Sequence, residues 1–425
     1  MFPRNWFELL VLILALLVLA IILLLLVNWA LTSNNNSKHK KKNVLLNIVK
    51  PNSYVVEVMK PVYVNTEEQA DQHLKSITNM LNIPHIHSYK YALYGFSTEN
   101  ISDAKLIEIR NHPEVNSVSP NFYYYAPPRS TIEVDPMFQV KSPTNDKINW
   151  GLTKIGAETA ALSTIPVDAD VIVLDTGVAN HKDLNVVERK SFILEEPDIY
   201  DNNGHGTHVA GIIGANNRSG IIVGVAPGVR IHAYKVLGAN GSGEMVDILA
   251  GMDEITKAID SGKFKLPVIV NMSIGVEVGE VYTKMDEILV RLANTDKVIF
   301  TVAAGNEYTD ASNYSPAHVP EAITVSAYGP RDMFADFSNY GRNIDVNAPG
   351  VDILSAGLNY DDYVLMSGTS MAAPMVAGLI AQAVSKQSIQ DLDRNKVVND
   401  WQNLPKNFTL TNLPSQTTGL VAKLA

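Results

Sequence analysis

The sequence predicts an α/β fold in which a doubly wound, mostly parallel sheet follows a small α+β domain and an apolar N-terminal segment. Three observations carry the prediction: an uninterrupted apolar run near the N-terminus, a β-α-β-β-α-β order of patterns after it, and a long alternation of β-branched runs with helical patterns from Trp150 onward. The expected parts are 1–43, an anchor or signal with a polar linker; 44–126, the small domain; 127–149, a linker; and 150–425, the main domain.

The main domain is predicted from five short β-branched runs that are interleaved with helical patterns. These runs are Val171–Leu174, Arg230–Val236, Val268–Ser273, Val298–Ala303 and Ala322–Ala327. One helical pattern places Met245, Ile248, Leu249, Met252, Ile255 and Ile259 on a single face. Buried strands that alternate with amphipathic helices are typical of a parallel sheet covered on both faces. In such a sheet, functional residues gather at the carboxyl ends of the strands.

The small domain is predicted from six shorter patterns. They are a strand at Tyr54–Met59, a helix at Glu67–Leu81, a strand pair within Tyr89–Phe96, a helix at Ser102–Arg110 and a strand at Val115–Val118. Their order is that of a split βαβ, ferredoxin-like sandwich. The proline-containing stretch Ala126–Asn149 has no periodicity and is interpreted as a linker.

The N-terminal run extends from Leu9 to Val27 and contains nineteen apolar residues without a break. This length is close to the roughly 20 residues of a membrane-spanning helix and exceeds the roughly 7–15 apolar residues of a signal peptide. Membrane insertion through residues 9–27 is therefore expected, with a cleaved signal as the alternative. The basic run Lys38–Lys42 would keep the rest of the chain in the cytoplasm, whereas the family resemblance described below favours export.

Composition limits the classes of function. The net charge of −10 argues against a nucleic-acid partner held by a broad phosphate-binding surface. The absence of cysteine excludes disulfides and thiolate metal sites. A hydrophobic fraction of 46% and a charged fraction of 18% are typical of a folded globular protein.

Four segments contain candidate catalytic residues. Asp175 follows a buried strand, His205 lies in Asn203–Gly211, Asn306 follows another strand, and Ser370 precedes an apolar helix. Alone, each has a structural interpretation: a strand-end carboxylate, a buried histidine, a turn asparagine and a helix cap. An aspartic protease would need a second Asp-Thr-Gly or Asp-Ser-Gly, and a zinc protease would need His-Glu-x-x-His; the chain has neither.

Together the four supply what acyl transfer by a serine requires: a nucleophile, a base, an acid that orients the base, and an oxyanion donor. Their order and flanking residues resemble the subtilisin family of serine proteases, in its proteinase K branch, over most of residues 150–425. The resemblance implies that Asp175 orients the imidazole and that His205 is the general base and then the general acid. It implies that Ser370 attacks the scissile carbonyl and that Asn306, with the Ser370 N–H, stabilises the oxyanion.

The resemblance also implies a substrate cleft. In the family, two edges clamp an extended polypeptide as an added strand; here they are implied to be Gly241-Ser242-Gly243 and Ser273-Ile274-Gly275. Ala303 and Gly305 are implied to contact substrate as well. Alone, the two edges could equally be a flexible loop and a core strand. The implied specificity is broad, with a leaning to apolar or aromatic residues before the cut, which Glu307 could widen to basic ones.

Residues 54–125 resemble the family's inhibitory propeptide, which implies that the chain is its own intramolecular inhibitor and cuts itself within Asn121–Asp135. The bond after Tyr125 is favoured because Pro127 and Pro128 would fit poorly on the leaving side. The alternative is that Tyr123, Tyr124 and Tyr125 only pack a domain interface. By the same resemblance the enzyme would be membrane-anchored or secreted, with its catalytic domain extracellular or lumenal.

The resemblance further implies one structural calcium site and no catalytic cofactor. Asp345 would supply a carboxylate, and Pro320 and Ala322 would supply carbonyl oxygens, the ligands that calcium prefers. Otherwise Asp345 is a surface residue. At a second family site Arg218 stands in place of a ligand, so Asp183 is not expected to bind calcium.

Two other classes of function remain as rivals. A non-catalytic homologue could bind peptides or act as an inhibitor, but a binding module has no need of all four catalytic residues. A nucleotide-binding α/β enzyme would need a glycine-rich phosphate turn after a strand. The chain contains no Gly-x-Gly-x-x-Gly or Gly-x-x-x-x-Gly-Lys turn there.

Overall fold

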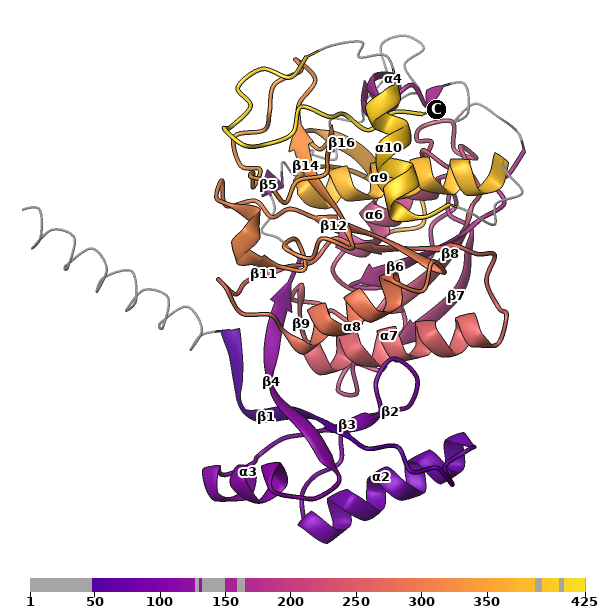
Figure 1. The fold of residues 1–425 in the computed structure, drawn as a ribbon. Coiled ribbons are helices and arrows are strands. Elements are labelled where there is room, and N and C mark those ends of the chain that lie inside the picture. The colour runs from indigo at the N-terminus through magenta and orange to yellow at the C-terminus, as the bar shows by residue number, and fades with distance from the viewer. Residues whose placement is uncertain are drawn as a thin grey trace, which may run out of the picture. The chain divides into compact units, whose positions relative to one another are not determined.

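Seven parallel strands form the main sheet in the order β15-β14-β12-β10-β6-β8-β7 (Figure 1). The computed structural model describes residues 48–126, 130–131, 150–158, 165–386, 392–404 and 409–424. The strands are β6 (Asp170–Asp175), β7 (Val186–Ser191), β8 (Arg230–Lys235), β10 (Val268–Met272), β12 (Val298–Ala303), β14 (Ile323–Tyr328) and β15 (Val346–Pro349). The five predicted runs match β6, β8, β10, β12 and β14, which confirms the predicted parallel α/β sheet.

Helices cover both faces of this sheet (Figure 1). α6 (His205–Gly214) and α9 (Thr369–Lys386) pack on each other at one face, and α7 (Met245–Asp260) and α8 (Lys284–Ala293) cover the other. All six apolar residues of the predicted α7 face are buried. The other described helices of the main domain are α4 (Trp150–Lys154) and α10 (Arg394–Asn403), with a 3-10 turn at Ala311–Asn313.

The order of strands along the chain reverses around β6, because the chain moves to β7 and β8 on one side and then to β10, β12 and β14 on the other. In an open α/β sheet, ligands bind outside the carboxyl ends of the strands at such a point. Asp175 ends β6, Ser273 follows β10, and Asn306 follows β12. The topology therefore brings three residues from distant parts of the chain to one edge of the sheet.

The small domain has the predicted order of elements. They are β1 (Val49–Val58), α2 (Glu67–Leu81), β2 (Ser88–Tyr89), β3 (Gly95–Thr98), α3 (Asp103–Arg110) and β4 (Val115–Tyr125). The four strands form an antiparallel sheet in the order β2-β3-β1-β4, and its core includes Val56, Leu74 and Phe96.

β4 is longer than the predicted strand and leaves the small sheet to pair with β9 (Ser242–Glu244) of the main domain (Figure 1). One strand is thus shared between the small sheet and the main domain. Two short antiparallel sheets complete the described fold: β11 (Val276–Glu277) with β13 (Tyr314–Ser315), and β16 (Ile353–Ala356), β17 (Tyr363–Ser367) and β5 (Ser130–Thr131).

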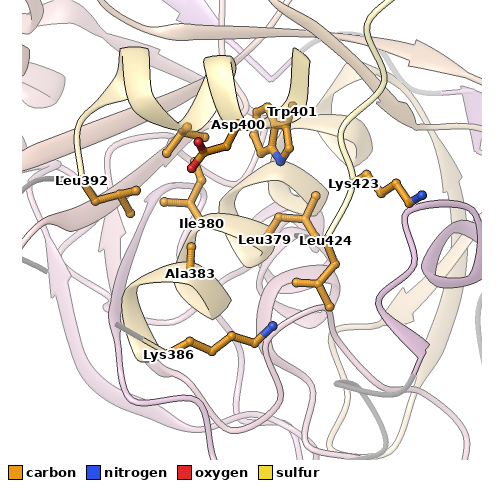
Figure 2. A pocket seen from close by; sticks show the side chains of 10 residues that line it. Leu379, Ile380, Ala383, Lys386, Leu392, Asp400, Trp401, Lys423 and Leu424 are labelled. Atoms are coloured by element: carbon orange, nitrogen blue, oxygen red, sulfur yellow. The ribbon is translucent and has the colours of Figure 1, made fainter. Parts of the chain in front are cut away.

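An apolar hollow of about 70 Å³ lies between α9, α10 and the last described residues (Figure 2). Leu379 and Ile380 of α9 line it together with Trp401 of α10 and Leu424. These α9 residues lie two and a half turns beyond Ser370. The hollow therefore belongs to the packing of the two helices and takes no part in the site described next.

Among the described ranges, no helix is both long and apolar enough to cross a membrane. The predicted span at residues 9–27 lies outside those ranges. So do the linker residues 127–129 and 132–149.

Candidate active site

Asp175 and His205 form a buried pair at the carboxyl end of β6. His205 Nδ1 lies 2.8 Å from Asp175 Oδ1 and 3.0 Å from Oδ2, and both side chains are at most 1% exposed. His205 is the first residue of α6, where Gly204 has φ = +98° and lets the chain turn into the helix. The carboxylate fixes the tautomer of the ring, with a proton on Nδ1 and a free lone pair on Nε2.

Ser370 is the second residue of α9. Its Oγ and His205 Nε2 are both buried, and neither has a hydrogen-bond partner in the described structure. Buried polar atoms are nearly always paired, so two unpaired ones in a predicted nucleophile and its predicted base are a signal of function. Catalytic hydrogen bonds are often long before substrate binds.

Ser370 is held by a chain of side chains that ends in the sheet. Ser273 Oγ donates to the Ser370 carbonyl (3.0 Å), Asn271 Nδ2 donates to Ser273 Oγ (3.0 Å), and Thr301 Oγ1 donates to Asn271 Oδ1 (3.1 Å). These three side chains are fully buried. Ser273, predicted to contact substrate, is thus hydrogen-bonded to the backbone of the predicted nucleophile.

Asn306 is oriented through its side-chain oxygen. Oδ1 accepts hydrogen bonds from Thr369 N (2.8 Å) and Thr369 Oγ1 (2.9 Å), directly beside Ser370. This leaves Nδ2 as a donor with no hydrogen bond to another described residue. Gly305 N donates to the same Thr369 hydroxyl (3.1 Å), which ties the end of β12 to the start of α9.

The surroundings of Gly305 explain why a glycine stands there. Its φ is +102°, and a Cβ would lie 2.2 Å from Asn339 Nδ2. Ala303 is the last residue of β12 and is buried. The carboxylate of Glu307 accepts from Asn306 N (2.8 Å) and Asn339 Nδ2 (2.9 Å).

Asp201 is a residue that the sequence interpretation missed. It is 4% exposed, and it joins the loop after Asp175 to the start of α6. Its Oδ1 accepts from Thr176 Oγ1 (2.9 Å), and its Oδ2 accepts from Thr207 N (3.0 Å) and Thr207 Oγ1 (2.6 Å). The sequence before His205 reads as an ordinary polar turn, so only the buried position of this carboxylate reveals its role.

The two predicted substrate edges hold a peptide segment in this structure, and the segment is the end of β4. Tyr123, Tyr124 and Tyr125 pair antiparallel with Glu244, Gly243 and Ser242. On the other side, Tyr125 N donates to Gly275 O (3.2 Å) and Gly275 N donates to Tyr125 O (2.9 Å). Ala126 N continues the ladder to Gly241 O (2.9 Å). We call these two edges, residues 241–243 and 273–275, the clamp.

The clamp corrects the prediction that the chain is cut after Tyr125. A scissile carbonyl must face the oxyanion donors, whereas the Tyr125 carbonyl already accepts the Gly275 N–H as part of an antiparallel bridge. The bond after Tyr125 therefore lies in the clamp. A cut bond would lie farther toward the carboxyl end, beyond Ala126.

The predicted calcium ligands are contacted by an arginine. The Arg394 guanidinium forms an ion pair with Asp345 Oδ1, and its Nε donates to the Ala322 carbonyl (3.2 Å). Burial raises the pKa of Asp345, and the nearby Arg394 opposes that rise. In this arrangement the residues do not fit a calcium ion, because a second cation would have to share two of the three predicted ligands, Asp345 and Ala322, with the guanidinium. Calcium binding stays a prediction.

Both carboxylate oxygens of Asp183 accept hydrogen bonds from protein groups. Ser219 N donates to its Oδ1 (2.7 Å) and Tyr363 OH donates to its Oδ2 (3.0 Å). Within the described part of the chain, no group of three or more His, Cys, Asp or Glu side chains is arranged to hold a metal ion.

Comparison with known proteins identifies what this geometry resembles. The subtilase family of peptidases (S8) matches residues 168–402, more than half of the chain. A thermostable alkaline protease of Halalkalibacterium halodurans is 40% identical over 240 residues, which are 56% of this chain and 63% of that protein. An extracellular serine proteinase of Thermus sp. is 36% identical over 303 residues, covering 69% of this chain and 67% of that protein. The solved structure of a cold-adapted subtilisin-like serine proteinase aligns with a TM-score of 0.53 at 31% identity, covering 65% of this chain and 98% of that one.

Proposed function

Because this chain belongs to the subtilase family of serine proteases, we propose that it is a serine endopeptidase that cuts polypeptides with Asp175, His205, Ser370 and Asn306. The observation that carries the proposal is the clamped segment Tyr123–Ala126. An extended peptide lies as an added strand between the two edges, and Ser273 of one edge donates to the Ser370 carbonyl. The same chain forms the buried Asp175–His205 pair and orients Asn306. A binding module would need the clamp but not the buried, unpaired Ser370 Oγ and His205 Nε2.

In the proposed reaction, Ser370 Oγ attacks the scissile carbonyl carbon while its proton passes to His205 Nε2. The carbonyl oxygen becomes an anion that Asn306 Nδ2 and the Ser370 N–H stabilise. The intermediate then collapses, the C–N bond breaks, and the departing amine takes the proton from Nε2. A water molecule, deprotonated by His205, then attacks the acyl-enzyme ester. The ester bond breaks, the carboxylic acid leaves, and Ser370 Oγ takes back its proton from His205. Throughout, Asp175 holds the Nδ1 proton and stabilises the imidazolium.

The proposed substrates are polypeptides, cut with broad specificity and a leaning to apolar or aromatic residues before the scissile bond. Backbone pairing to the clamp is independent of sequence, which supports breadth. The Glu307 carboxylate accepts two hydrogen bonds from protein groups, so less of its negative charge is available to attract a basic substrate side chain.

We propose further that residues 44–126, described here from Ile48 onward, act as an inhibitory propeptide, because their last residues fill the clamp. Other contacts support this role: Asp253 of α7 accepts the N–H groups of Lys90, Tyr91 and Ala92, and His87 Nε2 lies 2.9 Å from Asp247 Oδ1. A segment held in this way makes its own cleavage intramolecular. The cut would fall between Ala126 and Asp135.

The catalytic domain is proposed to act outside the cytoplasm, either anchored through residues 9–27 or secreted. The relative from Thermus sp., described as extracellular, supports export. A protease-protection assay on sealed vesicles tests this proposal, and a protected enzyme on the cytosolic side would contradict it.

Labelling with a fluorophosphonate tests the enzyme proposal directly. We expect the self-processed chain to be labelled at Ser370 and the Ser370→Ala chain to remain unlabelled. A folded wild-type chain that is neither labelled nor able to cut casein would instead be a non-catalytic homologue.

A further inference from the structure

Tyr124 is the fully buried member of the clamped segment. Side chains alternate along a strand, so Tyr124 points into the protein while Tyr125, on the opposite side, is 40% exposed. The Tyr124 hydroxyl lies 2.7 Å from Ser315 Oγ and 3.0 Å from Thr283 Oγ1. Burial raises the pKa of the phenol well above its ordinary value, so the hydroxyl keeps its proton.

The two partner hydroxyls have already used their own protons. Ser315 Oγ donates to Asp286 Oδ1 (2.5 Å) and Thr283 Oγ1 donates to Asp286 Oδ2 (2.8 Å). A hydroxyl has a single proton, so both oxygens present only lone pairs to Tyr124. The buried Asp286 carboxylate therefore makes this a site for a hydrogen-bond donor, and the phenol proton is directed to the nearer acceptor, Ser315.

A simpler interpretation accounts for only part of this network. Thr283 and Asp286 form the capping box of α8, which would exist without any peptide in the clamp. Ser315 lies outside that cap, since it comes from β13, 29 residues after Asp286. β13 pairs with β11, which begins immediately after Gly275 of the clamp. The second acceptor is thus delivered by the same structure that holds the peptide backbone.

From this geometry we propose that Thr283, Asp286 and Ser315, here called the Tyr124 pocket, select tyrosine in polypeptide substrates. The selected residue precedes by one the residue whose N–H and C=O both bond to Gly275. An aromatic ring fills the pocket, and its hydroxyl is recognised by the two acceptors. The proposal rests on the proposed function, because it concerns the peptides that the enzyme cuts.

The test uses the self-processed wild-type enzyme and an internally quenched peptide that copies residues 120–135. Three further peptides each replace one of Tyr123, Tyr124 and Tyr125 by phenylalanine, which removes a hydroxyl and leaves the ring. We expect kcat/KM to fall roughly five- to fiftyfold for the Tyr124→Phe peptide, because a buried site made to bind a hydroxyl discriminates against its absence. The Tyr125→Phe peptide is the matched control and should change kcat/KM less than twofold. Residual propeptide slows all four reactions by one factor and leaves their ratios unchanged.

A Ser315→Ala enzyme adds a second readout. It should cut the original and the Tyr124→Phe peptides at rates that differ less than about threefold, because the nearer acceptor is gone. If wild-type enzyme cuts both peptides equally well, the pocket reads only the ring and the inference is wrong, while the proposed function stands. If no peptide is cut and Ser370 is not labelled, the proposed function itself has failed.

Discussion

The active site lies at the carboxyl ends of the strands of the main sheet, and the corner around Asp345 lies at the amino ends of β14 and β15. The two regions treat polar atoms in opposite ways. At the active site, Ser370 Oγ and His205 Nε2 are buried without partners. In the corner, Asp345 accepts from both Arg394 and the Thr324 N–H. Reactivity needs polar groups whose donors and acceptors remain available to the substrate, whereas stability needs polar groups that form hydrogen bonds with one another. Substitutions in the first region should therefore change turnover, and substitutions in the second should change melting temperature.

The largest expected effect is that of Ser370→Ala. Removing the nucleophile should lower turnover by roughly a millionfold, a magnitude that comes from subtilisin itself. The uncut precursor should accumulate and be visible by mass spectrometry of the N-terminus, and added active enzyme should process it slowly. Cutting of the Ser370→Ala chain at the normal bond and rate, in a host without related proteases, would assign processing to another enzyme.

Asn306→Ala should lower kcat by roughly 10²–10³ with little change in KM, the loss measured for the corresponding donor in subtilisin. Thr369→Val is a milder variant for comparison, since it removes one of the two hydrogen bonds that orient Asn306 Oδ1. It should lower kcat in the same direction by a smaller factor. A loss confined to KM in both variants would make Asn306 a binding residue.

Asp201→Ala should lower kcat roughly ten- to hundredfold, because the loop after Asp175 and the start of α6 would lose their common anchor. Asp201→Asn keeps the volume and the oxygen that Thr176 bonds, and should recover part of that loss. If kcat falls only in proportion to the folded fraction measured by circular dichroism, Asp201 has a structural role alone.

The smallest effect on turnover is expected in the corner. Arg394→Ala should lower Tm by roughly 4–8 °C, equivalent to about 2 kcal/mol in a domain of this size, and leave kcat/KM unchanged. Lys396→Ala on the same helix is the control, because its ion pair with Asp400 is exposed and should contribute little.

Excess chelator distinguishes the two cations that could hold Asp345. With Arg394 in place, we expect the wild-type Tm to be insensitive to chelator. If chelator lowers the wild-type Tm and Asp345→Asn removes that sensitivity, calcium is bound at this corner and the guanidinium is displaced.

The sequence predicts those features well that depend on a local pattern of residues, such as a buried strand or a short motif. Five strands could be predicted because their β-branched runs are buried on both faces, and the four proposed catalytic residues could be singled out because each lies in a dense motif. β7 was missed because Glu188, Arg189 and Lys190 interrupt its apolar pattern, and β15 because it is short and ends in Pro349.

Long-range partners left no local signal. Arg394 lies 49 residues from Asp345, and no spacing rule connects them. The three consecutive tyrosines were recognised as the segment near the cleft. Which of them enters a pocket, and which carbonyl Gly275 holds, depends on the register of β4 against β9, and pattern alone does not determine that register.

The shared strand β4 has a consequence for how such an enzyme can change over generations. On the proposals made here, the Tyr124 pocket reads both the chain's own strand and the peptides that later replace it. A substitution at Ser315 would therefore change substrate specificity and inhibition by the propeptide in one step, since weaker recognition of tyrosine also weakens binding of the propeptide. Selection for a new substrate would have to be matched by a change at Tyr124, so the propeptide and the substrate specificity of the enzyme would evolve together.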